Sequence, residues 1–474
     1  MVTKYRFLNL FIVLSLVLSF ASYSSALAAP PVYVIDHFDT STETIDVTWA
    51  SSPGTPITNS ANVDDGNVLG GEREIVATVT GGINGEHLVV TTNNAGNSVA
   101  NAAGGSSLLY TVDFIYDGPN GTVGVDPTGL SVTNLTNIGG KTNNEFFVGI
   151  NSMDQLGSIS ILVYSNATSC SIVSLATIGK VYDSSHKIVE VPFTDFTTKC
   201  SGALTNATFT SVRAVVLRVT ASGGNAGLDI NIHSFGLAEP PFTDTGDLPD
   251  STVGTGYDYN LYYDPSGAAI GEIGPRHVIE GPTFGATITA EGDQQPDQNA
   301  ALDVDDGVVI SNYWATGPNG GFFDITINGC NPGPCYLSGF IDWDGSRSFY
   351  SGNPADFYTD ERILVDHPIA NGVTRVYFNV PNSASIINSF YYVRLRLENE
   401  TTSGFASPWG DTYSGEVQDY LVSFNATAVS LTSMQARTSS NPTPWLLLSA
   451  GFLVLVGSIS AGFVGVLKLK NRQR

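Results

Sequence analysis

Short runs of β-branched and aromatic residues recur along most of the chain, each bounded by Gly, Asn, Asp or Pro. Residues 87–92, 158–164, 214–219 and 391–397 are clear examples. Runs of this length between turn-forming residues are typical of β-strands. No stretch between residues 30 and 444 repeats apolar residues at helical spacing. The pattern predicts an all-β fold, built from two β-sandwich or jelly-roll domains in tandem.

The two ends of the chain carry longer apolar runs of a different kind. Residues 1–29 join Lys4 and Arg6 to an apolar stretch and a small-residue cleavage site, which is typical of a signal peptide. Residues 445–467 are uncharged and long enough to cross a bilayer as one helix. The basic tail, residues 468–474, favours a cytoplasmic end. These features predict a single-pass membrane protein at the cell surface with an extracellular N-terminal region. The alternative for residues 445–467 is a buried core helix.

The segment between the two ends divides into two units. Residues 30–238 begin and end with apolar runs that read as strands, and their pairing would bring the ends of this unit together. A proline-containing joint follows, and residues 243–425 form the second unit. Residues 426–444 are rich in Ser, Thr and Pro, which is typical of a stalk.

The charge balance changes the range of expected partners. Six of the 20 basic residues lie in the two ends, which leaves 14 against 44 acidic residues, a net charge of −30. Such a surface excludes nucleic acid as a partner, because phosphate contacts need clustered Lys and Arg. Acidic clusters supply oxygen ligands for divalent cations, but an acidic excess also keeps an exported protein soluble.

Four cysteines suit an oxidising compartment. Cys170 and Cys200 lie in the first unit, and Cys330 and Cys335 lie in the second. We expect one disulfide in each unit, the second closing a tight hairpin tip. Zinc is the alternative, although His186 is the one histidine between the first pair and none lies near the second.

The second unit contains a series of motifs that resembles the GEVED domain. Gly415-Glu-Val-Gln-Asp-Tyr420 resembles the motif that names this family, with Gln418 in place of Glu. Further resembling segments precede it in the expected order: residues 246–255, 275–279, 301–308, 337–345 and 392–397. The resemblance implies a β-sandwich module of large secreted or surface-anchored bacterial proteins, without catalytic activity of its own.

Within that motif we expect structural roles for Gly415, Glu416, Asp419 and Tyr420. Glu416 and Asp419 come just before the last strand of the unit. Their carboxylates are expected to cap a turn or to pair with Arg394 or Arg396.

One loop of the second unit carries a pattern suited to calcium. Its side-chain oxygens alternate along the chain, and a further carboxylate follows: Asp342, Asp344, Ser346, Ser348 and Glu361. Ca²⁺ takes six to eight oxygen ligands, and a loop of this kind supplies several of them. Ser346 and Arg347 replace an acid and a glycine of a full calcium loop, so a salt-bridged turn without metal stays open.

A second acidic cluster precedes a predicted strand. Asp303, Asp305 and Asp306 lie within four residues of one another. They are candidates for another calcium site, and an Asx-type turn is the alternative.

The first unit resembles jelly-roll carbohydrate-binding modules, with shorter motifs. Residues 34–38 and 229–235 resemble their first and last strands, and residues 68–75 resemble a GGxRD segment with Glu74 for Asp. The resemblance implies sugar binding on a sheet face through aromatic platforms, acids or amides, and a structural calcium near the termini. Tyr110, Phe114, Tyr116, Phe146 and Phe147 are the aromatic candidates, and burial in the core is the alternative for each.

No catalytic motif stands out in the sequence. A nucleophile elbow, a zinc-binding HExxH helix and a P-loop are all missing. We therefore expect a non-catalytic surface protein that acts in adhesion or presents a ligand, stabilised by calcium. The alternatives are a glycan-binding surface protein acting through the first unit, and a glycoside hydrolase of unrecognised type. The expected partners are an extracellular glycan or protein ligand and, through residues 445–467, the membrane.

Overall fold

The computed structural model describes most of the region in which the two units are predicted, and the two ends of the chain lie outside the described residues. The described residues run from 32 to 423. The gaps within that range are residues 40–41, 51–54, 65, 95–96, 121, 156, 179–180, 182–185, 251–256, 258, 260, 264–268, 273, 287, 292–299, 301–306, 312–313, 332, 350–360, 383, 385–389 and 401–406.

Several predicted segments fall outside this part of the chain. They are the signal peptide (1–29), the stalk (426–444), the apolar run (445–467) and the basic tail (468–474). Among the described residues, none belongs to a helix of the length and apolarity that a membrane span requires.

The described part of the chain is all-β, as the sequence predicts. It contains 29 strands and three short 3₁₀ turns at Leu69–Gly71, Phe193–Asp195 and Gly223–Asn225, and no α-helix.

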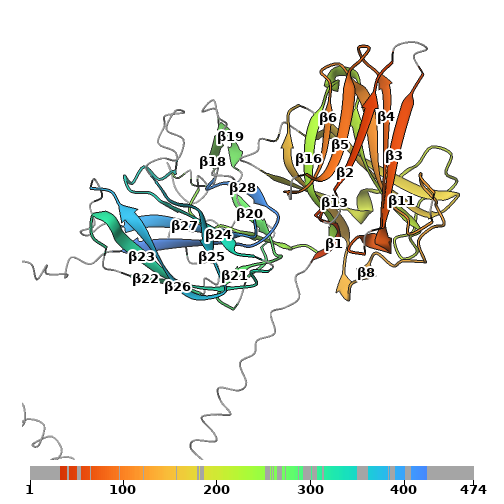
Figure 1. Cartoon of the computed structure of the whole chain (residues 1–474). Helices are drawn as coiled ribbons and strands as arrows, with labels where there is room; N and C mark the ends of the chain where they lie inside the picture. The colour runs from red at the N-terminus through yellow and green to blue at the C-terminus, as the bar shows by residue number, and fades with distance from the viewer. Residues whose placement is uncertain are drawn as a thin grey trace, which may run out of the picture. The chain divides into compact units, whose positions relative to one another are not determined.

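Two seven-stranded antiparallel sheets form the first unit (Figure 1). Sheet A runs in the order β13-β10-β16-β6-β5-β2, and β1 pairs with β16. Its strands are β1 (Val32–Asp36), β2 (Glu43–Thr48), β5 (His87–Asn94), β6 (Asn97–Gly104), β10 (Glu145–Met153), β13 (Lys187–Pro192) and β16 (Asp229–Ala238). Sheet B runs in the order β14-β12-β11-β15-β7-β4-β3. Its strands are β3 (Ile57–Asp64), β4 (Glu72–Gly81), β7 (Leu109–Tyr116), β11 (Gly157–Asn166), β12 (Ser169–Ile178), β14 (Thr198–Lys199) and β15 (Ala214–Ala221).

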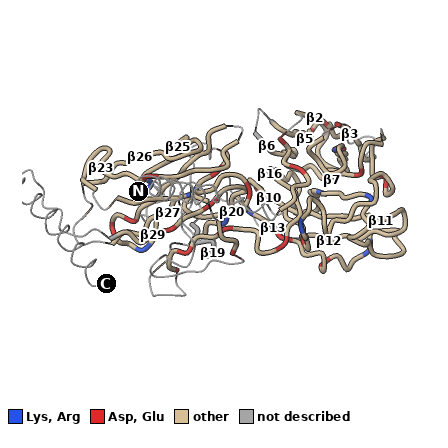
Figure 2. Tube along the Cα trace, turned by 90° about the horizontal axis from the view of Figure 1, so that it is seen from below, with Lys and Arg blue, Asp and Glu red and all other residues tan. Residues whose placement is uncertain are grey.

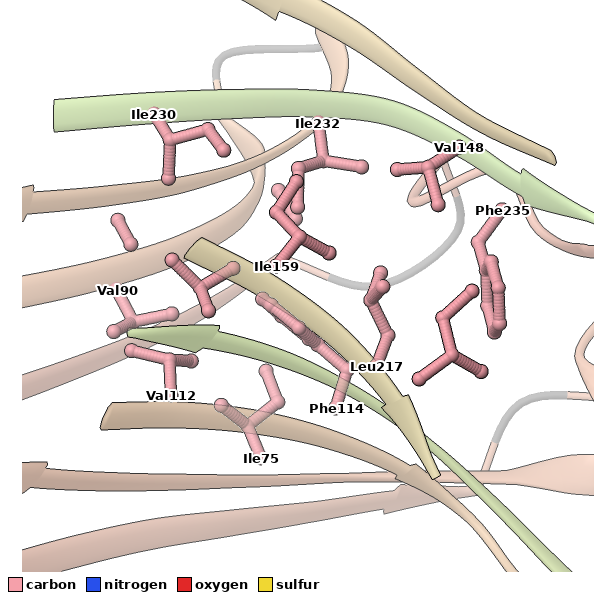
Figure 3. Packing of buried hydrophobic residues seen from close by; sticks show 14 of the residues in the cluster. Ile75, Val90, Val112, Phe114, Val148, Ile159, Leu217, Ile230, Ile232 and Phe235 are labelled. Atoms are coloured by element: carbon pink, nitrogen blue, oxygen red, sulfur yellow. The ribbon is translucent and has the colours of Figure 1, made fainter. Parts of the chain in front are cut away.

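Sheets A and B enclose one hydrophobic core, because alternate residues of each strand point inward. Ile75, Phe114 and Leu217 come from sheet B, and Val148 and Ile232 face them from sheet A (Figure 3). This is the layered arrangement of a β-sandwich. The pairing of β1 with β16 joins the two ends of the unit, as the sequence predicts.

Two four-stranded sheets form the larger part of the second unit. Sheet C contains β21 (Thr283–Phe284), β22 (Val308–Ile310), β23 (Gly317–Asn328) and β26 (Gly372–Val380). Sheet D contains β24 (Cys335–Ile341), β25 (Arg362–Ile369), β27 (Phe390–Glu398) and β29 (Glu416–Ser423). Phe323 and Ile325 of sheet C and Leu337 and Leu395 of sheet D belong to one buried cluster, so this unit has a core of its own.

Three smaller sheets complete the described strands. They are β17 (Thr243–Thr245) with β20 (Pro275–Val278) and β28 (Gly410–Thr412), β18 (Leu261–Tyr263) with β19 (Ala269–Glu272), and β8 (Asn137–Ile138) with β9 (Lys141–Thr142). Pairing of β20 with β28 is parallel. Arg276 on β20 forms ion pairs with Asp411 of the same small sheet and with Glu190 of the first unit.

Both predicted disulfides are present, Cys170–Cys200 and Cys330–Cys335. The expectation of a hairpin tip around the second one is wrong. β23 ends before Cys330 and pairs within sheet C, whereas β24 begins at Cys335 and pairs within sheet D. The short disulfide loop therefore carries the chain from one layer to the other, because each strand finds its partners in a different sheet.

Candidate functional site

The Gly415–Tyr420 motif forms a buried polar network at the start of β29. Gly415 has φ +100°, and a Cβ there would collide with the carbonyl oxygen of Leu397, so glycine is required. Glu416 accepts a hydrogen bond from the backbone N–H of Phe284 (2.6 Å) and one from Gln418 (2.8 Å). The hydroxyl of Tyr420 donates to Gln418.

Asp419 and Arg394 form a fully buried bidentate ion pair between β29 and β27. Nε and one terminal nitrogen of Arg394 lie 2.8 and 2.7 Å from the two Asp419 oxygens. The backbone N–H of Leu248 also donates to Asp419 (3.0 Å). This is one of the two pairings that the sequence suggested for Asp419, and it joins two strands of sheet D to an earlier segment.

The next arginine of β27 is buried against a histidine. Nε of Arg396 donates to Nε2 of His277 (2.9 Å), and Nδ1 of His277 lies 3.2 Å from the carbonyl oxygen of Ser414. Burial, with Arg396 beside the ring, holds the pKa of His277 well below its usual range. The ring is therefore neutral, with its proton on Nδ1. These buried contacts link β29 to β21, β27 and the segment at Leu248, which indicates a structural role for the motif.

The predicted calcium loop brings three of its carboxylates together. Single oxygens of Asp342, Asp344 and Glu361 lie within 4.8 Å of one another, with Asp342 and Glu361 buried and Asp344 exposed. Ser348 is buried and Ser346 is exposed, and the Ser346 hydroxyl donates to the carbonyl oxygen of Ser348 (3.0 Å).

The carboxylate of Asp342 is already used by hydrogen-bond donors. Oδ1 accepts from the backbone N–H groups of Gly345 (2.7 Å) and Ser346 (3.1 Å). Oδ2 accepts from the N–H of Arg347 (3.0 Å) and from the Tyr259 hydroxyl. A carboxylate has about four lone-pair positions, so a metal ion would have to displace a donor from Asp342. The guanidinium of Arg347 lies over the ring of Tyr257, 4.6 Å from its centre. Calcium here stays a prediction.

Asp303, Asp305 and Asp306 lie outside the described residues, and a metal site there also stays a prediction.

The aromatic residues considered for sugar stacking are core residues. Tyr110, Phe114, Tyr116, Phe146 and Phe147 are all almost completely buried. Phe146 stacks on Phe235, for example, and Phe147 lies in a separate buried cluster with Phe242 and Val278. A sugar ring cannot reach them, so a ligand of this unit would need other side chains.

The outer face of sheet A carries a row of polar side chains that cross-strand register creates. Thr44 pairs with Thr91, Thr91 with Asn101, Asn101 with Asn231, and Asn231 with Ser152. These five residues, from β2, β5, β6, β16 and β10, are called the polar row below. Thr44 is exposed and the other four are half-buried.

Hydrogen bonds fix the centre of the polar row. The amide nitrogen of Asn101 donates to the amide oxygen of Asn231 (2.6 Å), and the amide nitrogen of Asn231 donates to the hydroxyl of Ser152 (2.9 Å). An asparagine side chain offers two N–H donors and two acceptor positions. These bonds therefore leave donors and acceptors on both amides for a ligand with hydroxyl groups.

Charged groups flank the polar row on the same face. Asp46 pairs with Nδ1 of His87 (2.8 Å), and Asp229 accepts a hydrogen bond from the N–H of Gly104 (2.9 Å). The small side chains of Val89 and Ala103 lie between these positions in the register. Acidic residues occur along both units in Figure 2, so this face shares the general acidity of the chain.

A second outward face, on sheet C, is more apolar. Phe322 and Tyr377 are cross-strand neighbours with ring centres 5.9 Å apart, and the guanidinium of Arg375 lies 4.0 Å above the Phe322 ring. Arg375 also pairs with Asp324 through two bonds of 2.6 and 2.7 Å. Tyr377 is 51 % exposed on this face.

The sequence motifs did not reveal the polar row, because its members lie up to 187 positions apart and meet only through strand pairing. The available signal was the alternation in β2 and in the first half of β16, where polar residues occupy every second position.

Fold and site together define a protein whose described part is all-β, with two large hydrophobic cores and a polar sheet face. Residues 336–423 match the GEVED domain family, within the range 243–425 expected from the sequence. Among curated proteins, the comparison found no match.

The chain is also similar to solved structures of carbohydrate-binding modules. One is the family 11 module from Clostridium thermocellum in complex with a beta-1,3-1,4-mixed-linked tetrasaccharide, with 10 % sequence identity, coverage of 44 % of this chain and 97 % of that one, and a TM-score of 0.23. Another is the family 11 module of the cellulosomal cellulase Lic26A-Cel5E of Clostridium thermocellum, with 10 % identity, coverage of 44 % of this chain and 96 % of that one, and a TM-score of 0.22. A third is TmCBM61 in complex with beta-1,4-galactotriose, with 8 % identity, coverage of 40 % of this chain and 94 % of that one, and a TM-score of 0.16.

Proposed function

We propose that this protein is a non-catalytic cell-surface protein that holds an extracellular glycan on the outer face of sheet A. The observation that carries the proposal is the polar row, in which Asn101 and Asn231 are mutually oriented and half-exposed. Sugar hydroxyls both donate and accept hydrogen bonds, and amide side chains offer complementary groups. Asp46 and Asp229 add acceptors on either side of the row.

Holding a ligand at the cell surface also fits the sequence at the two ends. The apolar run at 445–467 would anchor the protein, and the stalk at 426–444 would place both sandwiches away from the bilayer. The GEVED module would then act as a structural element between the stalk and the first sandwich, since its motif residues serve buried contacts.

A glycan array tests this proposal directly. The purified full chain is expected to bind at least one class of polysaccharide and to release no shortened product from it. Failure to bind any glycan on a broad array would contradict glycan binding. Release of shortened products would support the hydrolase alternative instead.

A second candidate function is adhesion to a protein ligand through sheet C. Exposed Val373 (76 %) and Tyr377 (51 %) lie on its outer face, and exposed apolar groups favour protein contacts. Tyr377→Ser would reduce cell adhesion but leave glycan binding unchanged under this second proposal.

A further inference from the structure

Three carboxylates of the first sandwich lie together on the face of sheet B that points away from the core. Glu72 and Glu74 lie on β4, and Asp117 directly follows β7. Single oxygens of the three side chains lie within 4.8 Å of one another. Strand alternation explains this placement: Arg73, between the two glutamates, points into the core and pairs with Asp36 (2.9 Å).

These carboxylates are buried although they face outward. Glu72 is 3 % exposed, and Glu74 and Asp117 are 0 % exposed. The segment after Asp117 covers them, because its backbone N–H groups donate to all three. Asn120 donates to Glu72 (3.0 Å), Gly124 to Glu74 (2.7 Å) and Asp126 to Asp117 (2.6 Å).

The hydrogen-bond donors around the three carboxylates occupy only part of their lone-pair positions. The three carboxylates have about twelve lone-pair positions. Besides the three backbone bonds, the Asn120 side chain donates one long bond to Asp117 (3.4 Å). Glu74 and Asp117 also lie close enough to form a hydrogen bond with each other when one of them holds a proton. Oε1 of Glu74 is buried and receives no hydrogen bond from the described residues. By contrast, the carboxylate of Asp342 accepts four hydrogen bonds.

The charges around the cluster are also uncompensated. In the described part of the chain, no Lys, Arg or His lies within ion-pair distance of Glu72, Glu74 or Asp117. Buried carboxylates at this spacing need a cation or a shared proton.

We propose that Glu72, Glu74 and Asp117 bind a calcium ion that fastens the segment after β7 onto sheet B. Hard oxygen ligands in a loop-covered site favour Ca²⁺, and the mainly backbone contacts of the loop suit its irregular coordination. The site is distinct from the ends of the sandwich, because β1 and β16 both belong to sheet A. It is also distinct from the loop at Asp342. The inference does not depend on glycan binding.

Calcium titration of the chelator-treated full chain tests this site. The wild type is expected to bind calcium and to unfold at a higher temperature when it is added. Glu74→Gln keeps the shape of the side chain but removes one charge. It should weaken calcium binding at this site at least tenfold and remove most of the thermal shift. In chelator, the same variant should unfold at the wild-type temperature or above it, because a buried repulsion is relieved.

Asp195→Asn is the matched control, because it removes one exposed carboxylate of the first sandwich that belongs to neither acidic cluster, and it should keep the calcium-induced shift. Asp344→Asn reports separately on the loop at Asp342. If Glu74→Gln does not fold, Asp117→Asn replaces it with the same expectation. The proposal is overturned if millimolar calcium leaves the wild type unchanged, which would favour a shared proton between Glu74 and Asp117. It is also overturned if Glu74→Gln keeps the full calcium response, or if Asp344→Asn alone abolishes it.

Discussion

At the scale of single residues, buried charges organise both cores. Arg73 is completely buried in the first core, where it donates to Asp36 (2.9 Å) and to Glu43 (3.3 Å). Tyr116 donates to the same Asp36 (2.9 Å). In the second unit, Asp419 and Arg394 form a buried ion pair of the same kind. A buried charge without its partner is costly, so these residues link the strands that carry them.

Removal of Arg73 should therefore destabilise the first sandwich strongly. Arg73→Met leaves Asp36 buried without its ion-pair partner, and such changes cost about 3–5 kcal/mol. Arg218→Met is the control, since Arg218 pairs with Asp113 at a partly exposed position, where pairs contribute about 0.2–1 kcal/mol. Denaturant unfolding measures both, and equal losses would contradict the special role of Arg73.

His277 should make the second unit sensitive to acid. Its pKa in the folded state is depressed by burial and by Arg396, whereas the unfolded state takes up a proton near pH 6.5. The stability that neutral His277 contributes is therefore present above pH 6.5 and is lost as the pH falls below that value.

The slope of this loss is about 1.4 kcal/mol per pH unit for one proton. His277→Gln keeps an acceptor for Arg396 but cannot titrate in this range. Unfolding of the variant measured between pH 7 and 5 should lack this part of the slope. Identical slopes in the two proteins would show that His277 does not carry the effect.

At the scale of elements, strand register and cross-links decide which side chains meet. The disulfide Cys170–Cys200 links residues 30 positions apart, on β12 and just beyond β14. Cys330–Cys335 links residues five positions apart between sheets C and D. Each disulfide therefore fixes a segment next to strands that form the sheets: the first fixes the residue after β14 to β12, and the second fixes the segment between β23 and β24.

The two disulfides should differ in the stability that they provide. Closing a longer loop removes more entropy from the unfolded chain, which gives about 4 kcal/mol for Cys170–Cys200 and about 2 kcal/mol for Cys330–Cys335. Replacing each pair with alanines and measuring the free energy of unfolding tests this order. A larger loss from the short loop would contradict it.

Local patterns in the sequence predicted the elements well and the sites only in part. Alternation predicted the strands, and one cysteine pair per unit predicted the disulfides. Asp342 and Glu361 meet as expected, because Asp342 directly follows β24 and Glu361 directly precedes β25, which pairs with it. The polar row and the Glu72–Asp117 cluster depend on pairing between distant strands, which a single sequence does not specify.

At the scale of the whole molecule, we propose different roles for the two units. The second unit, which includes the GEVED match, uses its motif for buried contacts between strands. The first unit presents a polar sheet face with oriented amides. Under this proposal the second unit is a structural support for the first unit, and the first unit binds the glycan. Asn231 then lies at the centre of the proposed glycan-binding face.

The most direct test is the affinity of the full chain and its Asn231→Ala variant for the glycan that the array identifies. Loss of this amide removes ligand hydrogen bonds and frees Asn101 from its partner, so we expect about tenfold weaker binding, or about 1.4 kcal/mol. Asn137→Ala, on exposed β8, should bind as the wild type does. Unchanged affinity in Asn231→Ala would contradict the assignment of the glycan to the outer face of sheet A.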